Sequence, residues 1–275
     1  MLLLVKLTLA PSFVVGASLA ARRFGSHVGG LVGGLPVVAG PILLVYALAH
    51  GRNFAAGAAA GTLLGLVSLI CFVVVYGRLA GQMSWSASML AGWLAFGVAT
   101  VVFNVFTPPL GVALALVALA LAAGFAALPR PAWSSREHTP PPGWDLPLRA
   151  ACALALVVAL TAVSGWLGPQ LSGLLAPFPV ITTVLATFTH AQRGTQELAR
   201  LLRGLVSGFG AFALFCFSLD LALRRVDTLA AFAIATGLAL LTQSLVLALL
   251  RARLAAASPA AAAAGASAAP VVHEG

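Results

Sequence analysis

Long apolar runs separated by short polar breaks dominate the hydropathy pattern of this chain. A run of about 20 apolar residues is long enough to cross the roughly 30 Å of hydrocarbon in a bilayer. The pattern predicts nine spans, at about 2–21, 28–49, 54–77, 86–106, 109–128, 148–167, 171–190, 201–223 and 229–250. The predicted fold class is therefore an all-α integral membrane protein with about nine transmembrane helices.

The ends of the chain and one long loop fall outside these spans. The first run ends in GASLA and could be a signal peptide, but Lys6 within it and Arg22-Arg23 after it favour a retained helix. Residues 129–147 form an exposed Pro-rich loop, since Pro and charged residues suit a connector. The Ala-rich residues 255–275 are either a tenth span or a disordered tail, and their two prolines favour the tail.

Composition agrees with a membrane protein. The chain is 61% hydrophobic and 8% charged, whereas soluble domains are about a quarter charged. The net charge of +9 needs no nucleic-acid partner, because the positive residues lie mostly at span ends, where they set topology. The expected partner is the lipid bilayer.

The distribution of positive residues predicts the orientation. One side carries 11 of the 15 Lys and Arg residues, namely Arg22, Arg23, Arg78, Arg130, Arg136, Arg149, Arg193, Arg200, Arg203, Arg251 and Arg253. The other side carries Lys6, Arg52, Arg224 and Arg225. The excess predicts an inner (plasma) membrane protein with its N-terminus outside and its C-terminus in the cytoplasm.

An internal repeat appears when the sequence is laid over itself so that Pro36 meets Pro179. Residues 24–72 then align with 167–215 without a gap and are identical at 10 of 49 positions. The identical pairs are Gly25/Gly168, Gly30/Gly173, Leu31/Leu174, Pro36/Pro179, Val37/Val180, Gly51/Gly194, Ala56/Ala199, Gly61/Gly204, Gly65/Gly208 and Phe72/Phe215. Shared glycines, a proline and a phenylalanine in one register favour a duplication.

Five crossings separate equivalent points of the two repeats, and an odd number inserts them upside down relative to each other. The prediction is two inverted four-helix repeats joined by one reversing helix, a layout found in many secondary transporters. The expected units are the first repeat (1–108), the reversing helix (109–128), the loop (129–147), the second repeat (148–254) and the tail (255–275).

Matching spans of the two repeats carry Pro/Gly interruptions, in GGLPVVAGP (33–41) and APFPVITT (176–183). A midspan break frees backbone groups that protein or water must satisfy, so paired breaks in inverted halves point to a binding site at the membrane midplane. Close helix packing is the alternative explanation. The candidate substrate-binding residues are Gly33, Gly34, Pro36, Gly40, Pro41, Pro177, Pro179, Thr182, Thr183, Thr187 and Gln243.

Polar residues within the spans are few. The threonine hydroxyls could bond back to their own helix and Gln243 could bond a neighbouring helix. Of the six acidic residues only Asp220 approaches a span interior, four residues from Arg224, which predicts an ion pair. This scarcity argues against a carboxylate-relay pump and favours coordination by backbone and hydroxyl groups or passive facilitation of an unknown, possibly anionic, small molecule.

Signatures of catalysis, cofactors and metals are absent from the sequence. The chain has no HExxH motif and no nucleophile elbow, and its three cysteines stand apart in apolar runs. We expect no enzyme activity, no cofactor and no metal. The run Gly57, Gly61, Gly65 forms a small-residue face that predicts close helix packing, either within the fold or in a homo-oligomer.

The stretch from Leu171 to Leu205 resembles the GlpM-like family of small inner-membrane proteins. Gly173-Leu174, Phe178-Pro179 and Arg193-Gly194 carry the resemblance, while the first half keeps Gly30, Leu31 and Pro36 but has Leu35 and His50 at the other positions. The resemblance implies a fused pair of small units and a cell-envelope context linked to alginate production.

The expected function is a small secondary transporter or facilitator, and the alternative is a scaffold or assembly factor for envelope polymers.

Overall fold

The computed structural model describes the backbone of residues 2–105, 108–131, 142–174 and 178–267. Side-chain surroundings are described within these ranges except at 2–10, 104, 160–174, 250–251 and 253–267. The regular elements in the described ranges are helices: α1 (Leu2–Phe24), α2 (Ser26–Gly33), α3 (Ala39–His50), α4 (Arg52–Leu79), α5 (Trp85–Asn104), α6 (Leu110–Ala127), α7 (Asp145–Leu174), α8 (Val180–Leu223) and α9 (Thr228–Ser267).

Five of the helices in the described part of the chain are long and apolar enough to cross a membrane, namely α4, α5, α6, α8 and α9. Their mean hydropathy over the most apolar stretch ranges from 1.7 to 2.5. The chain is thus an all-helical protein of the membrane-embedded kind, as the sequence predicts, although these helices alone do not establish the expected nine spans.

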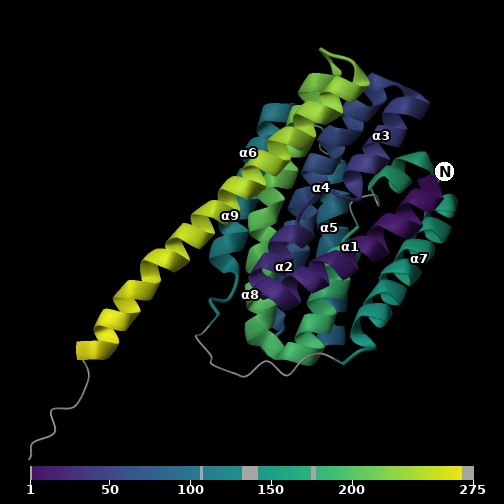
Figure 1. Cartoon of the computed structure of the whole chain (residues 1–275). Coiled ribbons are helices and arrows are strands. Elements are labelled where there is room, and N and C mark those ends of the chain that lie inside the picture. The colour runs from purple at the N-terminus through teal and green to yellow at the C-terminus, as the bar shows by residue number, and fades with distance from the viewer. Residues whose placement is uncertain (1, 106–107, 132–141, 175–177, 268–275) are drawn as a thin grey trace, which may run out of the picture.

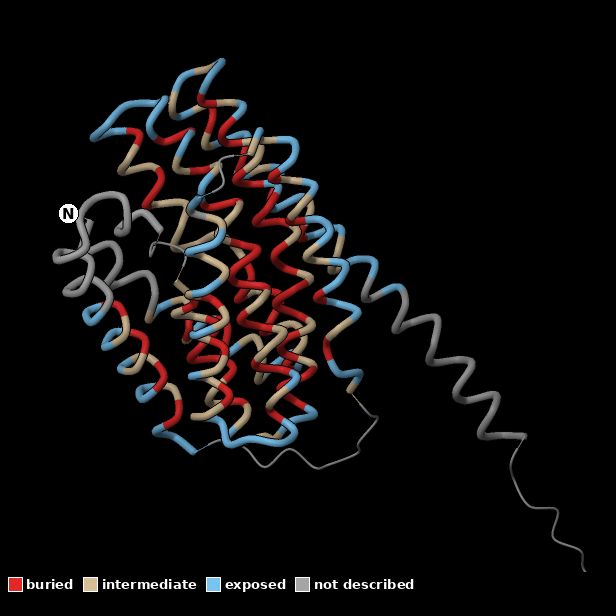
Figure 2. Tube along the Cα trace, turned by 180° about the vertical axis from the view of Figure 1, so that it is seen from behind, coloured by how far each residue is buried: buried red, intermediate tan, exposed pale blue. Residues whose placement is uncertain are grey.

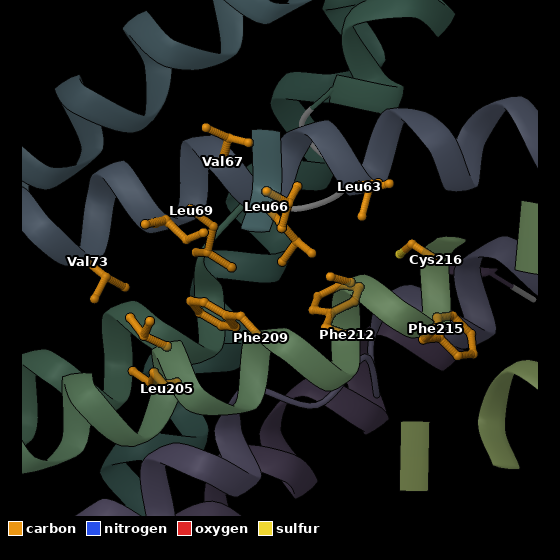
Figure 3. Close-up of a cluster of buried hydrophobic side chains, with 14 of the residues drawn as sticks. Leu63, Leu66, Val67, Leu69, Val73, Leu205, Phe209, Phe212, Phe215 and Cys216 are labelled. Atoms are coloured by element: carbon orange, nitrogen blue, oxygen red, sulfur yellow. The ribbon is translucent and has the colours of Figure 1, made fainter. Parts of the chain in front are cut away.

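Helices α4 and α8 form the centre of the bundle (Figure 1). Two thirds of the apolar stretch of α8 is buried, against 17% for α5, α6 and α9. Leu63, Leu66 and Val73 of α4 meet Leu205 and Phe209 of α8 in this core (Figure 3). The buried positions accordingly run through the middle of the bundle (Figure 2).

Large exposed apolar side chains cover the outer helices. Leu94 and Val98 on α5, and Leu241 and Leu245 on α9, are each 60% exposed or more. Such a continuous apolar exterior would be costly in water and suits contact with lipid chains. The bundle therefore has a packed α4–α8 centre and an apolar outer layer.

Among the described residues, Gly25, Gly51 and Gly194 have positive φ, and each lies where one helical segment ends and the next begins. Gly51, between α3 and α4, has φ 87° and ψ 166°, and Gly194, inside α8, has φ 81° and ψ −178°. Glycine adopts this region readily because it lacks a Cβ atom. Gly194 divides α8 into a segment before it (180–193) and a segment after it (195–223), which correspond to the separately predicted spans 171–190 and 201–223.

The helix bounds differ from the predicted spans in three places. The predicted span 28–49 is divided into α2 and α3, and α7 continues through 168–170, where a boundary between spans was predicted. Pro169 lies inside α7, as proline does in membrane helices whose freed backbone groups find other partners. Helix α9 continues to Ser267, into the segment expected to be a tail, because alanine has the highest helix propensity.

Candidate functional site

Both predicted helix interruptions are breaks between helices. Helix α2 ends at Gly33 and α3 begins at Ala39, while α7 ends at Leu174 and α8 begins at Val180. Pro179 occupies the position before the first turn of α8, where its missing N–H costs nothing. Pro177 lies outside the described residues. Pro36 and Pro179 thus lie in chain segments between helices, whereas Pro41 lies in the first turn of α3.

The end of α2 packs directly on the backbone of α8. A Cβ atom added to Gly34 would lie 2.8 Å from the Gly208 Cα and 2.8 Å from the Leu205 carbonyl oxygen. One added to Gly204 would lie 2.9 Å from the carbonyl carbon of His27 and closer still to its oxygen. Gly30 makes an equally close approach to the Leu201 carbonyl. Glycines on both helices therefore permit backbone-to-backbone contact, the packing role that small residues have in membranes.

Gln243 of α9 supplies a hydrogen-bond partner that the break in α2 requires. Its Nε2 donates to the Leu31 carbonyl oxygen at 2.7 Å, and the side chain is 5% exposed. The Leu35 N–H, the donor that a continued helix would offer this carbonyl, instead bonds the Val32 oxygen at 3.1 Å. Gln243 thus satisfies a buried carbonyl, as the packing interpretation of this residue predicts.

The threonines after the second break contact α4 and α5. The Trp93 indole N–H donates to the Thr183 hydroxyl at 3.1 Å, and the Trp93 ring lies 5.6 Å from that of Phe178. Thr182, also on α8, is 3% exposed. The buried Thr187 hydroxyl lies one turn further along, beside Tyr76. Thr183 and Thr187 therefore face neighbouring helices rather than the α2–α3 break.

The space between the two breaks is filled by apolar side chains. A Cβ atom at Gly33 would lie 2.8 Å from Leu185 Cδ1 and 3.2 Å from Leu205 Cδ2, with Ile181 next to them. Leu185 is 1% exposed. The candidate residues of the two breaks consequently do not line one shared polar cavity in the described part of the chain.

A groove lies instead on the other side of the α2–α3 break, against α8 and α9. It has a volume of about 510 Å³, and Pro36, Gly40 and Pro41 form one wall. Phe215 of α8, and Phe232 and Thr236 of α9, form the opposite walls. Its size falls within the roughly 300–1,000 Å³ of ligand pockets, and its lining is almost entirely apolar. Three of the candidate residues thus border a cavity that sequence reasoning did not anticipate.

Buried acidic residues form ion pairs at one end of the bundle. Asp145, fully buried, accepts hydrogen bonds from Arg22 at 2.7 Å, Arg149 at 2.9 Å and Gln192 at 2.8 Å, and so connects α1, α7 and α8. Burial alone would raise the pKa of Asp145, but these donors and the charge of Arg149 hold it below its ordinary value of 3.8.

Glu197 forms a second such group. It accepts a hydrogen bond from Ser26 at 2.6 Å and pairs with Arg200. Neither acid was predicted from the sequence, although their i+4 and i+3 spacing from an arginine was visible. The predicted pair of Asp220 with Arg224 is confirmed, at 2.8 Å.

The described residues contain no group of three or more His, Cys, Asp or Glu side chains that could hold a metal ion. Their chemistry is that of packing, ion pairing and an apolar groove.

Comparison of the chain with protein-family models, with curated proteins and with solved structures found no match.

Proposed function

We propose that this chain is a small multi-pass transporter or facilitator, built from two inverted four-helix repeats, whose substrate site is the groove beside the α2–α3 break. The observation that carries the proposal is the lining of this groove by Pro36, Gly40 and Pro41. Broken helices in transporters lie where irregular backbone borders a cavity, and the groove supplies that cavity.

Features at equivalent positions of the two repeats support the duplication. Gly51 and Gly194, an identical pair in the sequence alignment, share nearly the same backbone angles. The register that pairs them also pairs the start of α5 at Trp85 with the start of α9 at Thr228. In addition, α5 packs along α4 as α9 packs along the second part of α8. The pairing extends beyond the aligned stretch, which ended at Phe72 and Phe215.

The arrangement of charges supports the proposed orientation. Arg22 and Arg149 meet at Asp145, next to the Gly194 joint of α8, while Arg52 bonds the Val226 carbonyl oxygen at the other end of α8. The arginine-rich end would face the cytoplasm of a bacterial-type inner membrane, with the N-terminus outside. The GlpM-like resemblance, as a proposed origin of the fused units, fits the same envelope location.

The lining of the groove favours an apolar or amphiphilic substrate over the anionic one considered from sequence. None of the candidate hydrogen-bonding side chains lines the groove, since Thr183 lies against Trp93 and Gln243 donates through Nε2 to the Leu31 carbonyl. A desolvated anion among Phe215, Phe232 and Pro36 would lack compensating partners, which costs several kcal/mol.

A non-transporting scaffold is the second candidate, and the glycine contacts favour it. Gly34 and Gly208 bring two backbones into direct contact, which makes a tightly packed interface between α2 and α8. The filled space at Leu185 between the breaks also suits an unmoving core. The two candidates differ in whether the repeats move relative to each other.

Distances between spin labels in bilayers separate the two functions. One cysteine pair, Leu48→Cys with Leu229→Cys, reports on the Arg52 end, and another, Trp85→Cys with Leu148→Cys, on the Asp145 end. All four positions are exposed, and the background lacks Cys71, Cys152 and Cys216. A carrier predicts two distance populations at one end or at both.

The control is a pair within the first repeat, Leu48→Cys with Val105→Cys, which should give one population. A single narrow distribution for both cross-repeat pairs would refute the carrier and favour the scaffold. A second population in the control as well would mean local helix motion instead of movement between repeats, and would also count against the carrier.

A further inference from the structure

The groove has a counterpart in the other half of the chain. The register of the repeat alignment gives, for each lining residue, the position that occupies the same place in the other repeat. Thr236 corresponds to Trp93, Ala239 to Phe96, Gly40 to Thr183 and Leu35 to Phe178. Three of these four residues are much smaller than their counterparts, and Leu35 replaces an aromatic ring with leucine. Of the other lining residues, Phe232 and Leu240 are larger than their counterparts Met89 and Gly97.

The larger residues fill the counterpart position. Phe178 lies 5.6 Å from the Trp93 ring and 5.5 Å from the Phe96 ring, at angles typical of aromatic packing. The indole N–H of Trp93 is satisfied by the Thr183 hydroxyl. Phe96 is 2% exposed. In one repeat this place is therefore plugged by three rings and a hydrogen bond.

The groove residues cannot form such a plug. Gly40 has no hydroxyl to bind an indole, and Thr236 and Ala239 are too short to reach across to Leu35. A ring added at these positions would bury apolar area worth roughly 25 cal/mol per Å². An empty apolar cavity lacks this stabilising free energy of burial. Water does not replace it, because an apolar lining offers water no hydrogen-bond partners. The cavity is best filled by a mobile apolar ligand.

The surroundings of the groove show where such a ligand would come from. Leu240, a lining residue, is 54% exposed, and Leu238 and Leu241 next to it on α9 are exposed as well. This outer face of α9 is in contact with lipid chains when the helix crosses the bilayer. A groove bordered by that face receives its occupant laterally from the hydrocarbon layer.

We infer that the groove holds an acyl chain of a bilayer phospholipid, in the place that Trp93, Phe96 and Phe178 fill in the other repeat. The inference rests on the groove being the site of the proposed function and names the ligand class of that site. Acyl-chain binding requires no movement of the repeats, so its test is independent of the spin-label distances.

The test uses a phosphatidylcholine analogue with a photoactivatable diazirine in its acyl chain, added to vesicles of phosphatidylethanolamine and phosphatidylglycerol that contain the full chain. Peptide mass spectrometry locates the labelled residues after illumination. The wild-type chain should be labelled in 35–44 and 232–240 more heavily, per residue, than on the lipid-exposed face of α5 at Leu94 and Val98.

A plug-copy variant, Leu35→Phe and Gly40→Thr with Thr236→Trp and Ala239→Phe, transplants the plug into the groove. Labelling there should fall roughly tenfold, since the rings take the apolar surface that the chain would cover. The matched control is Leu241→Trp, which adds an indole to the same helix outside the groove and should leave labelling unchanged. Thermal unfolding in detergent shows whether each variant folds.

The reverse variant, Trp93→Thr with Phe96→Ala, opens the counterpart and should create new labelling within 178–187. The inference is overturned when wild-type labelling of the groove equals that of the α5 face, a comparison that needs no variant. Equal labelling of a folded plug-copy variant and the wild type would overturn it too. Groove labelling together with a single spin-label distance would support the lipid site and refute the carrier function.

Discussion

Replacing Gly204 with alanine tests the backbone contact between α2 and α8. The new Cβ atom would lie 2.9 Å from the His27 carbonyl carbon, whereas ordinary contact begins at 3.4 Å. The helices would have to move apart to admit it, and the carbonyl oxygen, which lies closer still, demands the larger movement. Overpacking of this kind costs about 1–3 kcal/mol, and backbone on both sides leaves no flexible side chain to yield.

Gly61→Ala is the matched control, because Gly61 is the sequence counterpart of Gly204 in α4. A Cβ atom there meets nothing within 4 Å, so the variant should gain up to about 1 kcal/mol of helix propensity. Thermal unfolding in detergent measures both variants. With roughly 2–4 °C per kcal/mol, Gly204→Ala should unfold several degrees below the wild type and Gly61→Ala at or above it. Equal unfolding temperatures for the two variants would refute the assigned contact.

Three further predictions concern buried polar groups. Gln243→Leu should lower the free energy of unfolding by about 1–3 kcal/mol, because the Leu31 carbonyl loses its partner. Ser244→Ala, at an exposed position of α9, is the control, and equal stability of the two variants would contradict the role of Gln243. Trp93→Phe should cost about 0.5–1.5 kcal/mol through loss of the hydrogen bond to Thr183, and in a double-mutant cycle with Thr183→Val the two losses should not add; additive losses would refute the bond. Asp145 has a lowered pKa, so its stabilising effect should be complete above about pH 5 and fade as the pH falls through and below 3.8. The unfolding-temperature gap between wild type and Asp145→Asn should narrow over that range, and a gap that does not depend on pH would contradict the ion-pair assignment.

The helical, membrane-embedded character of the chain and both breaks could be predicted from sequence. Apolar runs of spanning length leave few alternatives, and Pro36 and Pro179 cannot continue a regular helix. The first and last residues of the individual helices were predicted less well. Hydropathy predicts a boundary between the spans 148–167 and 171–190, yet α7 continues through 168–170 to Leu174.

The function of each glycine could not be predicted, because that depends on which helices become neighbours. The small-residue face at Gly57 and Gly61 was expected to pack closely, but within the described structure both positions are open. The close contacts occur instead between α8 and α2, where Gly204 meets His27 and Gly208 meets Gly34. The homo-oligomer through the Gly57–Gly61–Gly65 face stays a prediction.

The groove lay beyond sequence reasoning for a different reason. A repeat is recognised in a sequence by the residues that its two copies share. The groove lies where the two proposed repeats differ, with Thr236 in place of Trp93 and Ala239 in place of Phe96. Each substitution alone looks like an ordinary change in an apolar helix. Together they remove two rings from one place, and Pro36 in the α2–α3 break and Gly40 and Pro41 at the start of α3 border the space that is left. In a duplicated membrane protein, the positions where one copy has lost bulk are therefore where a ligand site is to be sought, more than the positions that both copies share.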